Sequence, residues 1–355
     1  MIAAQLAGEI EARGSVGVDT FMAAALAAYY GTRDPLGAAG DFTTAPEISQ
    51  IFGEILGLWC ADRWLRLGRP NPVRLVELGP GRGTLMTDIL RALKVLPDCR
   101  AAVEVHLVET SPTLRARQSD TLAAHHPDKP LQWHARCEDV PDGPLLLVAN
   151  EFLDALPIQQ WRRRAGGWVE RRITRDIPAV PTGGAIGFRF VDGAEIRTDR
   201  DLPILPPPAE DGEIFETCAP ALDIAAWTGR RLAAASGAAL FIDYGHAISA
   251  PGETLQALRA HRFAPVLDLP GEADLTAHVD FGALATALTA AGARIDPVVT
   301  QARFLTENGA LQRLATLQRG KPEAEAATLG IGLRRLIDPA QMGTLFKVLA
   351  AHSPS

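Results

Sequence analysis

The chain has 355 residues, 47% of them apolar, and a formal net charge of −7 at pH 7. A chain of this length and apolar content buries a sizeable core and forms about two domains, or one large domain with insertions. Its acidic balance argues against a general affinity for phosphate backbones, so we expect no nucleic-acid partner.

The cysteines and the N-terminus bear on compartment and metal binding. The four cysteines are far apart and form no C-x-x-C pair, so neither a zinc site nor a disulfide framework is predicted. No uncharged run approaches the roughly 18 residues that a membrane-spanning helix needs. The N-terminus also lacks the features of a secretory or mitochondrial leader. We therefore expect a cytoplasmic protein without a metal site or membrane insertion.

Residues 1–70 are expected to form a helical N-terminal region, because residues 2–14 and 49–68 repeat apolar side chains every three or four positions. The loop between these helices contains GDFTT, in which Gly40 permits a hinge and Thr43 and Thr44 precede a helix start. We interpret this loop as a candidate lid that touches a ligand. The alternative is an ordinary N-cap and first helical turn.

From residue 71 the chain alternates apolar strands with amphipathic helices, which predicts a parallel sheet covered on both faces. Before residue 155 the expected strands and helices lie at 73–78, about 83–94, 103–109, after Pro112, at 131–134 and at 144–150. Later elements are expected at 219–235, 238–243, 281–291, 293–300 and in MGTLFKVLAAH. These elements together predict an α/β fold with a seven-strand doubly wound sheet.

Two segments interrupt this alternation and are interpreted as insertions, at about residues 155–215 and 246–280. The first contains IQQWRRRAGGWVERRIT, which predicts a β-hairpin that turns at Gly166-Gly167. Its arginine run, residues 162–164, is expected on a solvated edge of that hairpin rather than in a ligand site.

The strongest local motif is LVELGPGRGTL, between a strand and a helix. Gly79, Gly81 and Gly83 allow a tight turn and a close approach of a ligand to the helix N-terminus. The dinucleotide fingerprint needs Gly or Ala at position 84, which is Thr84 here. A carboxylate at Glu77 would repel a pyrophosphate, but it suits the ammonium group of S-adenosylmethionine. We therefore predict S-adenosylmethionine as the cofactor.

Acidic residues follow the next two strands. Glu109 ends the neighbouring strand, at the edge where α/β sheets bind ligands, and is expected to accept the two ribose hydroxyls. Glu138 and Asp139 follow the third strand, and either suits the adenine amino group. The alternative for each is an ordinary strand-end or helix-cap residue.

At this point the residues resemble a known family. The similarity is carried by blocks from residue 40 to residue 350, which are GDFTTAPEISQIFGEILGLW, LVELGPGRGTLM, VHLVETSP, VANEFLDALP, FIDYGH, GETLQALRAHRF, GEADLTAHVDF and MGTLFKVLA. They are similar to the MidA family of S-adenosylmethionine-dependent methyltransferases. The resemblance implies a class I methyltransferase (Rossmann-like) domain over residues 71–355. It also implies kinship to a mitochondrial member that dimethylates an arginine during assembly of respiratory complex I.

The block VANEFLDALP places polar residues after an apolar strand. If the acceptor is an arginine, Glu151 and Asp154, three residues apart, can face the same way and hold its guanidinium, while Asn150 holds either the cofactor or the acceptor. The alternative is that Asn150 caps a short helix whose dipole favours the acids. A DNA amino-methyltransferase would show an Asn/Asp-Pro-Pro-aromatic stretch here, and the stretch NEFL lacks both prolines. Asp243, Tyr244 and His278 are further candidates near the same edge, with His278 assigned to catalysis.

The sequence therefore predicts a protein arginine methyltransferase that acts on a protein substrate and can form a homodimer. Two alternatives stay open at this point. One is an S-adenosylmethionine-binding assembly factor without catalytic activity, and the other is a methyltransferase that acts on nitrogen or oxygen atoms of a small molecule.

Overall fold

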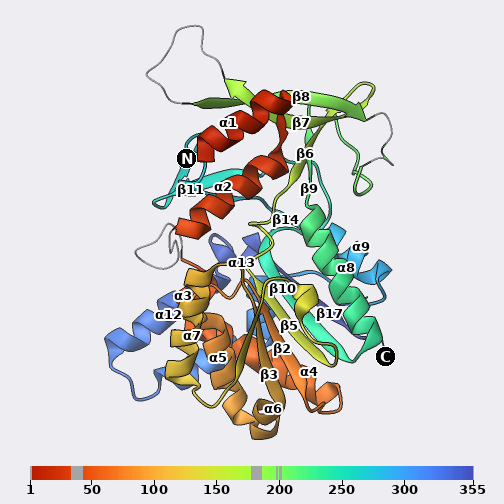
Figure 1. Ribbon diagram of the computed structural model, residues 1–355. Coiled ribbons are helices and arrows are strands. Elements are labelled where there is room, and N and C mark those ends of the chain that lie inside the picture. The colour runs from red at the N-terminus through yellow and green to blue at the C-terminus, as the bar shows by residue number, and fades with distance from the viewer. Residues whose placement is uncertain (1, 33–42, 177–185, 197–198, 200–201, 355) are drawn as a thin grey trace.

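The computed structural model describes residues 2–32, 43–176, 186–196, 199 and 202–354. The chain forms two parts that lie one above the other in Figure 1. The lower part surrounds a large mixed sheet with helices. The upper part is built from smaller antiparallel sheets and the two N-terminal helices.

The central sheet has nine strands. Seven follow the order β15-β17-β10-β5-β2-β3-β4, β14 pairs with β10, and β16 pairs with β17. Their bounds are β2 Val73–Leu78, β3 Val103–Val108, β4 Leu131–His134, β5 Leu145–Asn150, β10 Gly237–His246, β14 Val279–Asp280, β15 Arg294–Ile295, β16 Val299–Thr300 and β17 Phe346–His352. The strands from β4 to β10 are parallel, whereas β17 runs antiparallel to β10. The expected α/β fold is confirmed.

Helices cover both faces of this sheet, so the central strand β5 is apolar up to its last residue, Asn150. Every residue of β5 is buried, and each leucine of its run Leu145–Leu147 is at most 1% exposed. One face carries α3 Ala45–Ile48, α4 Gln50–Arg66, α5 Thr84–Ala92, the 3-10 turn η1 Leu93–Val95, α6 Pro97–Ala102, α7 Pro112–His125, α10 Gln301–Glu307, α11 Ala310–Gln318, α12 Glu323–Ile337 and α13 Met342–Leu345. The other face carries α8 Ala219–Ala234 and α9 Phe281–Ala290.

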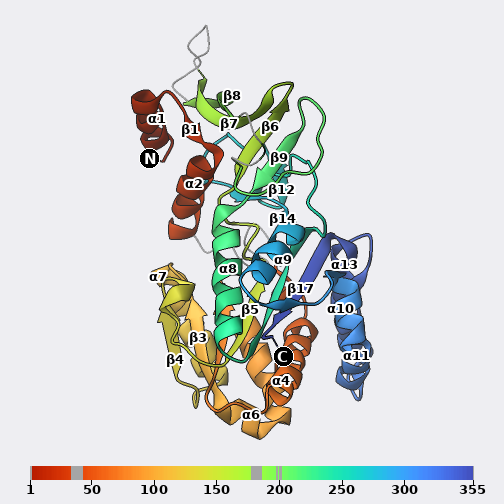
Figure 2. The same ribbon diagram turned by 90° about the vertical axis from the view of Figure 1, so that its right-hand side faces the viewer.

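The upper part joins the N-terminus to both inserted segments. Its strands are β1 Val16–Gly17, β6 Gln159–Arg164, β7 Gly167–Asp176, β8 Gly187–Ile196, β9 Ile214–Thr217, β11 Gln256–Arg259, β12 Arg262–Ala264 and β13 Asp274–Thr276. The helices α1 (Ile2–Arg13) and α2 (Val18–Thr32) pack beside them, as Figure 2 shows. Leu6, Phe21, Ile173 and Leu275 share one hydrophobic core. Segments far apart in sequence therefore form one layer above the sheet edge.

Three local expectations need correction. The hairpin turns at Ala165-Gly166, because Arg164 pairs with Gly167, the first residue of β7. Its strand β6 lies between β7 and β9, so it is an inner strand rather than an edge. The single strand expected at 293–300 is two strands of two residues each, separated by a break that contains a proline. The helices α10 to α12 were not predicted at all.

The four cysteines are free thiols. Within the described residues, no group of three or more His, Cys, Asp or Glu side chains is arranged to hold a metal ion. No helix in that same portion of the chain combines the length and apolarity needed to cross a bilayer.

Candidate active site

A cavity of about 790 Å³ lies at the carboxyl ends of the parallel strands, between the two parts of the molecule. This edge is where open α/β sheets bind ligands, because loops rather than helices meet there. The residues singled out from the sequence that line the cavity are Thr43, Thr44, Glu77, Gly79, Gly81, Glu109, Asn150, Glu151, Asp154, Tyr244 and His278. Four others, Gly83, Glu138, Asp139 and Asp243, lie outside its lining. The lid hinge at Gly40 lies outside the described residues.

The glycine loop between β2 and α5 needs glycine for its backbone. Gly79, Gly81 and Gly83 have φ values of 64°, 53° and 83°, a region that strains other residues. A Cβ atom on Gly79 would also lie 2.5 Å from the Cδ2 atom of Phe152. Gly83 is the N-cap of α5 and does not line the cavity, so its role is to shape the loop.

Glu77 is the penultimate residue of β2, and its side chain is buried, at 2% exposure. Burial raises the pKa of its carboxyl to about 8, although the N–H of Met86 donates to it and favours the charged form. Among the described residues the Oε2 atom of Glu77 has no hydrogen-bond partner. An orphaned buried carboxylate oxygen needs a partner. A ligand ammonium in the cavity meets this need, so the site fits the methionine end of S-adenosylmethionine.

Glu109 is fixed at the end of β3 by its surroundings. Its Oε1 atom accepts the N–H of Ser111 at 2.8 Å, and its Oε2 atom accepts Nε2–H of Gln118 at 3.3 Å. Gln118 is itself held, because it donates to the carbonyl of Gly81 at 2.8 Å and accepts from Trp133 at 2.9 Å. This network ties the acid predicted to bind ribose to the glycine loop.

Glu138 and Asp139 lie in the 3-10 turn η2 (Cys137–Asp139), where both are exposed. The carboxylate of Glu138 pairs with the guanidinium of Arg136 at 3.2 Å, and that of Asp139 accepts the N–H of Arg136 at 3.2 Å. Their contacts in the structure are those of a capped turn. Contact of either residue with adenine stays a prediction.

Asn150 and Glu151 form a tight pair at the end of β5. The Nδ2 atom of Asn150 donates to Oε1 of Glu151 at 3.2 Å, and the N–H of Ala45, at the start of α3, donates to the same oxygen at 2.7 Å. Burial raises the pKa of Glu151 to about 7. The Oδ1 atom of Asn150 is buried and has no partner among the described residues. Both an acceptor amide oxygen and an acid therefore face the cavity.

Asp243 follows the last residue of β10 that pairs with β5, and it holds the backbone that carries these acids. Its Oδ2 atom accepts the N–H groups of Phe152, Leu153 and Asp154 at 3.1, 3.0 and 3.2 Å, and its Oδ1 atom accepts the N–H of Tyr244 at 3.0 Å. Burial and the neighbouring carboxylates raise the pKa of Asp243, whereas these donors favour its charged form. It is a positioning residue behind the cavity wall.

Asp154 is held from the other side by Tyr244. Burial raises the pKa of Asp154, and the hydrogen bond with the Tyr244 hydroxyl lowers it in part. Tyr244 also bonds the Thr276 hydroxyl, and its ring meets that of His278 edge to face at 5.4 Å. Burial, with His246 and Lys347, lowers the pKa of His278, which favours a neutral imidazole. The geometry therefore gives His278 a packing role beside Tyr244, and its part in catalysis stays a prediction.

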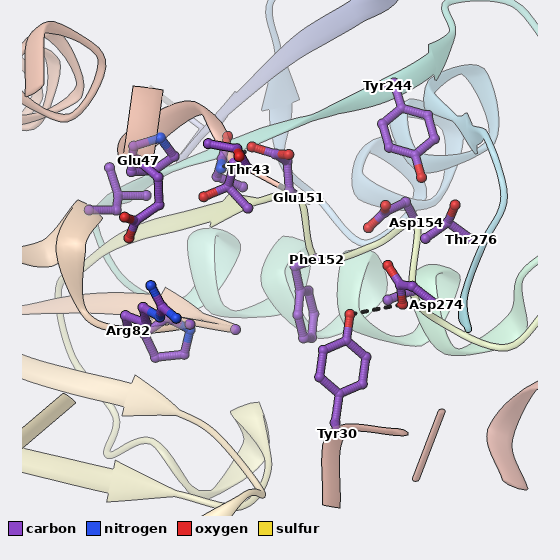
Figure 3. A pocket seen from close by; sticks show the side chains of 18 of the residues that line it. Tyr30, Thr43, Glu47, Arg82, Glu151, Phe152, Asp154, Tyr244, Asp274 and Thr276 are labelled. Carbon is purple, nitrogen blue, oxygen red and sulfur yellow. Dashed lines mark hydrogen bonds between the residues drawn. The ribbon is translucent and has the colours of Figure 1, made fainter. Parts of the chain in front are cut away.

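The sequence did not single out several residues of the same cavity. Figure 3 shows Arg82 on one side, and Tyr30, Asp274 and Thr276 on the other. The hydroxyl of Thr84 donates to Glu47 at 2.6 Å, which joins α3 to α5. Asp274 and Thr276 belong to the block GEADLTAHVDF, whose three acids were the available signal.

The family is decided by comparison with known proteins. Residues 55–299 match a family model described as "Putative S-adenosyl-L-methionine-dependent methyltransferase". The chain belongs to this methyltransferase family. It is therefore an S-adenosylmethionine-dependent methyltransferase, and S-adenosylmethionine is its cofactor.

Relatives of this methyltransferase cover nearly its whole length. It is 36% identical over 365 residues to the Danio rerio protein named protein arginine methyltransferase NDUFAF7, mitochondrial, with 96% of this chain and 84% of the relative covered. The Homo sapiens protein of the same name is 34% identical, with 96% and 81% covered. A Burkholderia thailandensis crystal structure with bound S-adenosyl-homocysteine is 30% identical, with a TM-score of 0.84 and 99% and 91% covered. The resemblance stated from the sequence is confirmed.

Proposed function

We propose that this methyltransferase methylates an arginine side chain of a protein substrate. The observation that carries the proposal is the charge of the cavity. Two arginines, Arg82 and Arg335, line it together with six carboxyl side chains, those of Glu47, Glu77, Glu109, Glu151, Asp154 and Asp274. A wall of this composition favours cationic ligands. Relatives named protein arginine methyltransferase support an arginine as the acceptor.

The cofactor supplies a methyl group on a sulfonium. In this proposal Glu77 binds its ammonium group, the loop at Gly79 and Gly81 lets its backbone approach closely, and Glu109 accepts its ribose hydroxyls. Thr43 and Thr44 line the cavity beside Glu47 and close the site from the N-terminal side. Strand β2 lies between β3 and β5, so Glu109, which would hold the ribose, and the acids after β5, which would hold the acceptor, lie on opposite sides of β2.

Glu151 and Asp154 orient the acceptor. Their carboxylates hold the guanidinium along one edge, with Glu151 bonded to the nitrogen that is aimed at the methyl group. A bond forms between that nitrogen and the methyl carbon, the bond from the carbon to sulfur breaks, and the nitrogen loses a proton. Glu151 accepts this proton, because a pKa of about 7 suits a base at neutral pH.

The wider assignments belong to the same proposal. The order β15-β17-β10-β5-β2-β3-β4 supports a seven-strand class I methyltransferase sheet, with β15 and β16 together replacing one strand. We propose a domain over residues 71–355, with residues 1–70 and the two insertions adding to its substrate face. A subunit of respiratory complex I as substrate, a homodimer and a cytoplasmic location stay predictions. The eukaryotic relatives are named as mitochondrial.

Cofactor binding and methyl transfer are tested separately. Calorimetry with S-adenosylmethionine is expected to show binding by the wild type and none by Gly81→Val, because a β-branched residue does not tolerate a φ of 53°. An absence of binding by the wild type would overturn the cofactor assignment.

The acceptor is tested by mass spectrometry of arginine methylation in cells with and without the gene. We expect a methylarginine that disappears with the gene and returns with the wild type. Glu151→Gln and Asp154→Asn are expected to lower its formation about 100-fold while they retain cofactor binding. Full function of both variants would instead support an assembly factor without catalysis, and methyl label found only on small molecules would support the other alternative.

A further inference from the structure

The wall of the cavity opposite the cofactor loop comes from the upper part of the molecule. Strand β13 alternates, so that Asp274 and Thr276 line the cavity while Leu275 between them packs into the core. Asp274 is 4% exposed, and the hydroxyl of Tyr30 on α2 donates to its Oδ1 atom at 3.0 Å. A buried acid therefore faces the cavity from an element that contributes nothing to the glycine loop.

This acid and its tyrosine repeat an arrangement found on the central sheet. Asp154 bonds the hydroxyl of Tyr244, and Asp274 bonds the hydroxyl of Tyr30. Figure 3 shows Asp154 and Asp274 close together, with the two tyrosines on opposite sides of them. Asp274 is one of the groups that raise the pKa of Tyr30, and Asp154 is another, which is consistent with both acids lying near that ring. Two carboxylates, each oriented by a phenol, thus meet in one chamber.

Resting on the proposed function, we propose that Asp274, oriented by Tyr30, is a specificity-determining residue that selects a guanidinium over an ammonium. A guanidinium is planar and presents five N–H donors along its edges, so it suits carboxylates that approach from two elements. A lysine ammonium is a compact charge with three donors on one atom, and it gains less from a second carboxylate set apart from the first. Asp274 binds one edge of the acceptor while Asp154 and Glu151 bind another.

A purely structural role explains the pair less well. Tyr30 and Asp274 join α2 to β13, yet the same elements already share a hydrophobic core through Phe21, Leu26 and Leu275. Asp274 also lines the cavity together with Asp154, where a cationic side chain of the substrate would contact its carboxylate.

The test uses the purified full-length protein, labelled S-adenosylmethionine and a heat-treated lysate of cells that lack the gene. The readout is the initial rate of label recovered as methylarginine. Asp274→Asn is expected to lower this rate at least 10-fold, and Tyr30→Phe a few-fold, with the dissociation constant for S-adenosylmethionine within twofold of the wild type. Glu272→Gln is the matched control, because it removes a nearby carboxylate that pairs with Arg259 outside the cavity lining.

A second measurement separates selectivity from stability. The protein labelled by the wild type is prepared with its target arginine and with lysine in its place, and the two rates are compared. The ratio of arginine to lysine methylation is expected to fall at least 10-fold in Asp274→Asn and to stay unchanged in Glu272→Gln. If Asp274→Asn does not bind the cofactor, Tyr30→Phe decides the question by the same ratio.

Two negative results have different meanings. A wild type that labels no arginine contradicts the proposed function itself. A wild type that labels arginine while Asp274→Asn and Tyr30→Phe keep both its rate and its ratio overturns the role of Asp274 alone.

Discussion

Glu151 has a backbone conformation that disfavours every residue except glycine. Its φ is 49°, in the left-handed region, where a side chain costs about 1–2 kcal/mol. Hydrogen bonds on both sides stabilise this strained conformation. The N–H of Glu151 donates to the carbonyl of Ile242 at 2.9 Å, and the carboxylate of Asp243 accepts the N–H groups of the residues that follow. Strain of this kind is concentrated at functional sites. The strained backbone therefore identifies Glu151 as a functional residue, as does the acidic lining of the cavity.

This strain gives a prediction at residue 151. Glu151→Gly is expected to be more stable than Glu151→Ala by about 1 kcal/mol, because only glycine adopts this φ freely. Both variants lose the carboxylate and methyl transfer with it. Urea unfolding measures the difference in the free energy of unfolding.

The matched control pair is Glu325→Gly and Glu325→Ala on α12, where the order is expected to reverse by about 1 kcal/mol in favour of alanine. An alanine variant at position 151 as stable as the glycine variant would contradict the strain.

At the scale of elements, the site depends on how β10 supports the end of β5. The two strands pair in parallel register through Ile242 and Asn150, so that Asp243 lies directly beneath the turn of residues 152–154. The N–H groups of this turn have no partner strand, and the carboxylate of Asp243 accepts their hydrogen bonds instead. The conformation of the turn at residues 152–154 therefore depends on the pairing of β10 with β5.

Asp243→Asn tests the support that Asp243 gives this turn. An amide of the same shape has one oxygen acceptor where the carboxylate has two, so at least one of the four N–H donors faces an NH₂ group. We expect a loss of about 1–3 kcal/mol in the free energy of unfolding. We also expect slower methyl transfer with a smaller change in cofactor affinity, because the turn carries Asp154 but not the glycine loop. Unfolding, turnover and calorimetry on the same preparation check this, and unchanged turnover would show that Asp243 does not position the acids.

For the whole molecule, the buried acids link stability to pH. Burial raises the pKa values of Glu77 to about 8 and of Glu151 to about 7, above the 4.5 of an exposed glutamate. The folded protein therefore holds protons that the unfolded chain has lost. Their contribution to stability is complete below pH 4.5 and is lost as the pH rises to about 8. In the proposed function these acids bind cationic ligands, and they do so in their charged form.

The melting temperature of the ligand-free protein is accordingly expected to fall by several degrees between pH 6 and pH 8.5. Stabilisation by S-adenosylmethionine is expected to grow over the same range, because its ammonium binds ionised Glu77. Glu77→Gln should show a smaller fall and no stabilisation by the cofactor. Thermal unfolding across this pH range measures both effects, and an equal fall in the variant would remove Glu77 as their cause.

The sequence by itself determined the strands β2 to β5 and the glycine loop that follows β2. Strands such as β5 were predicted correctly, since a strand buried on both faces is largely apolar, and the glycine loop needs its glycines for local backbone reasons. Acids at the ends of strands, such as Glu77 and Glu109, were predicted to contact a ligand, and they line the cavity because parallel strands end at the same edge.

Only the tertiary structure decided which side chains join Glu151 and Asp154 in the acceptor half. Tyr30 and Asp274 are 244 positions apart, and they meet because α2 packs against β13 through apolar contacts that no local pattern specifies. The role of Asp243 depends on strand register, which likewise cannot be read from spacing. Local periodicity and turn chemistry set the elements, whereas long-range packing brings their side chains together.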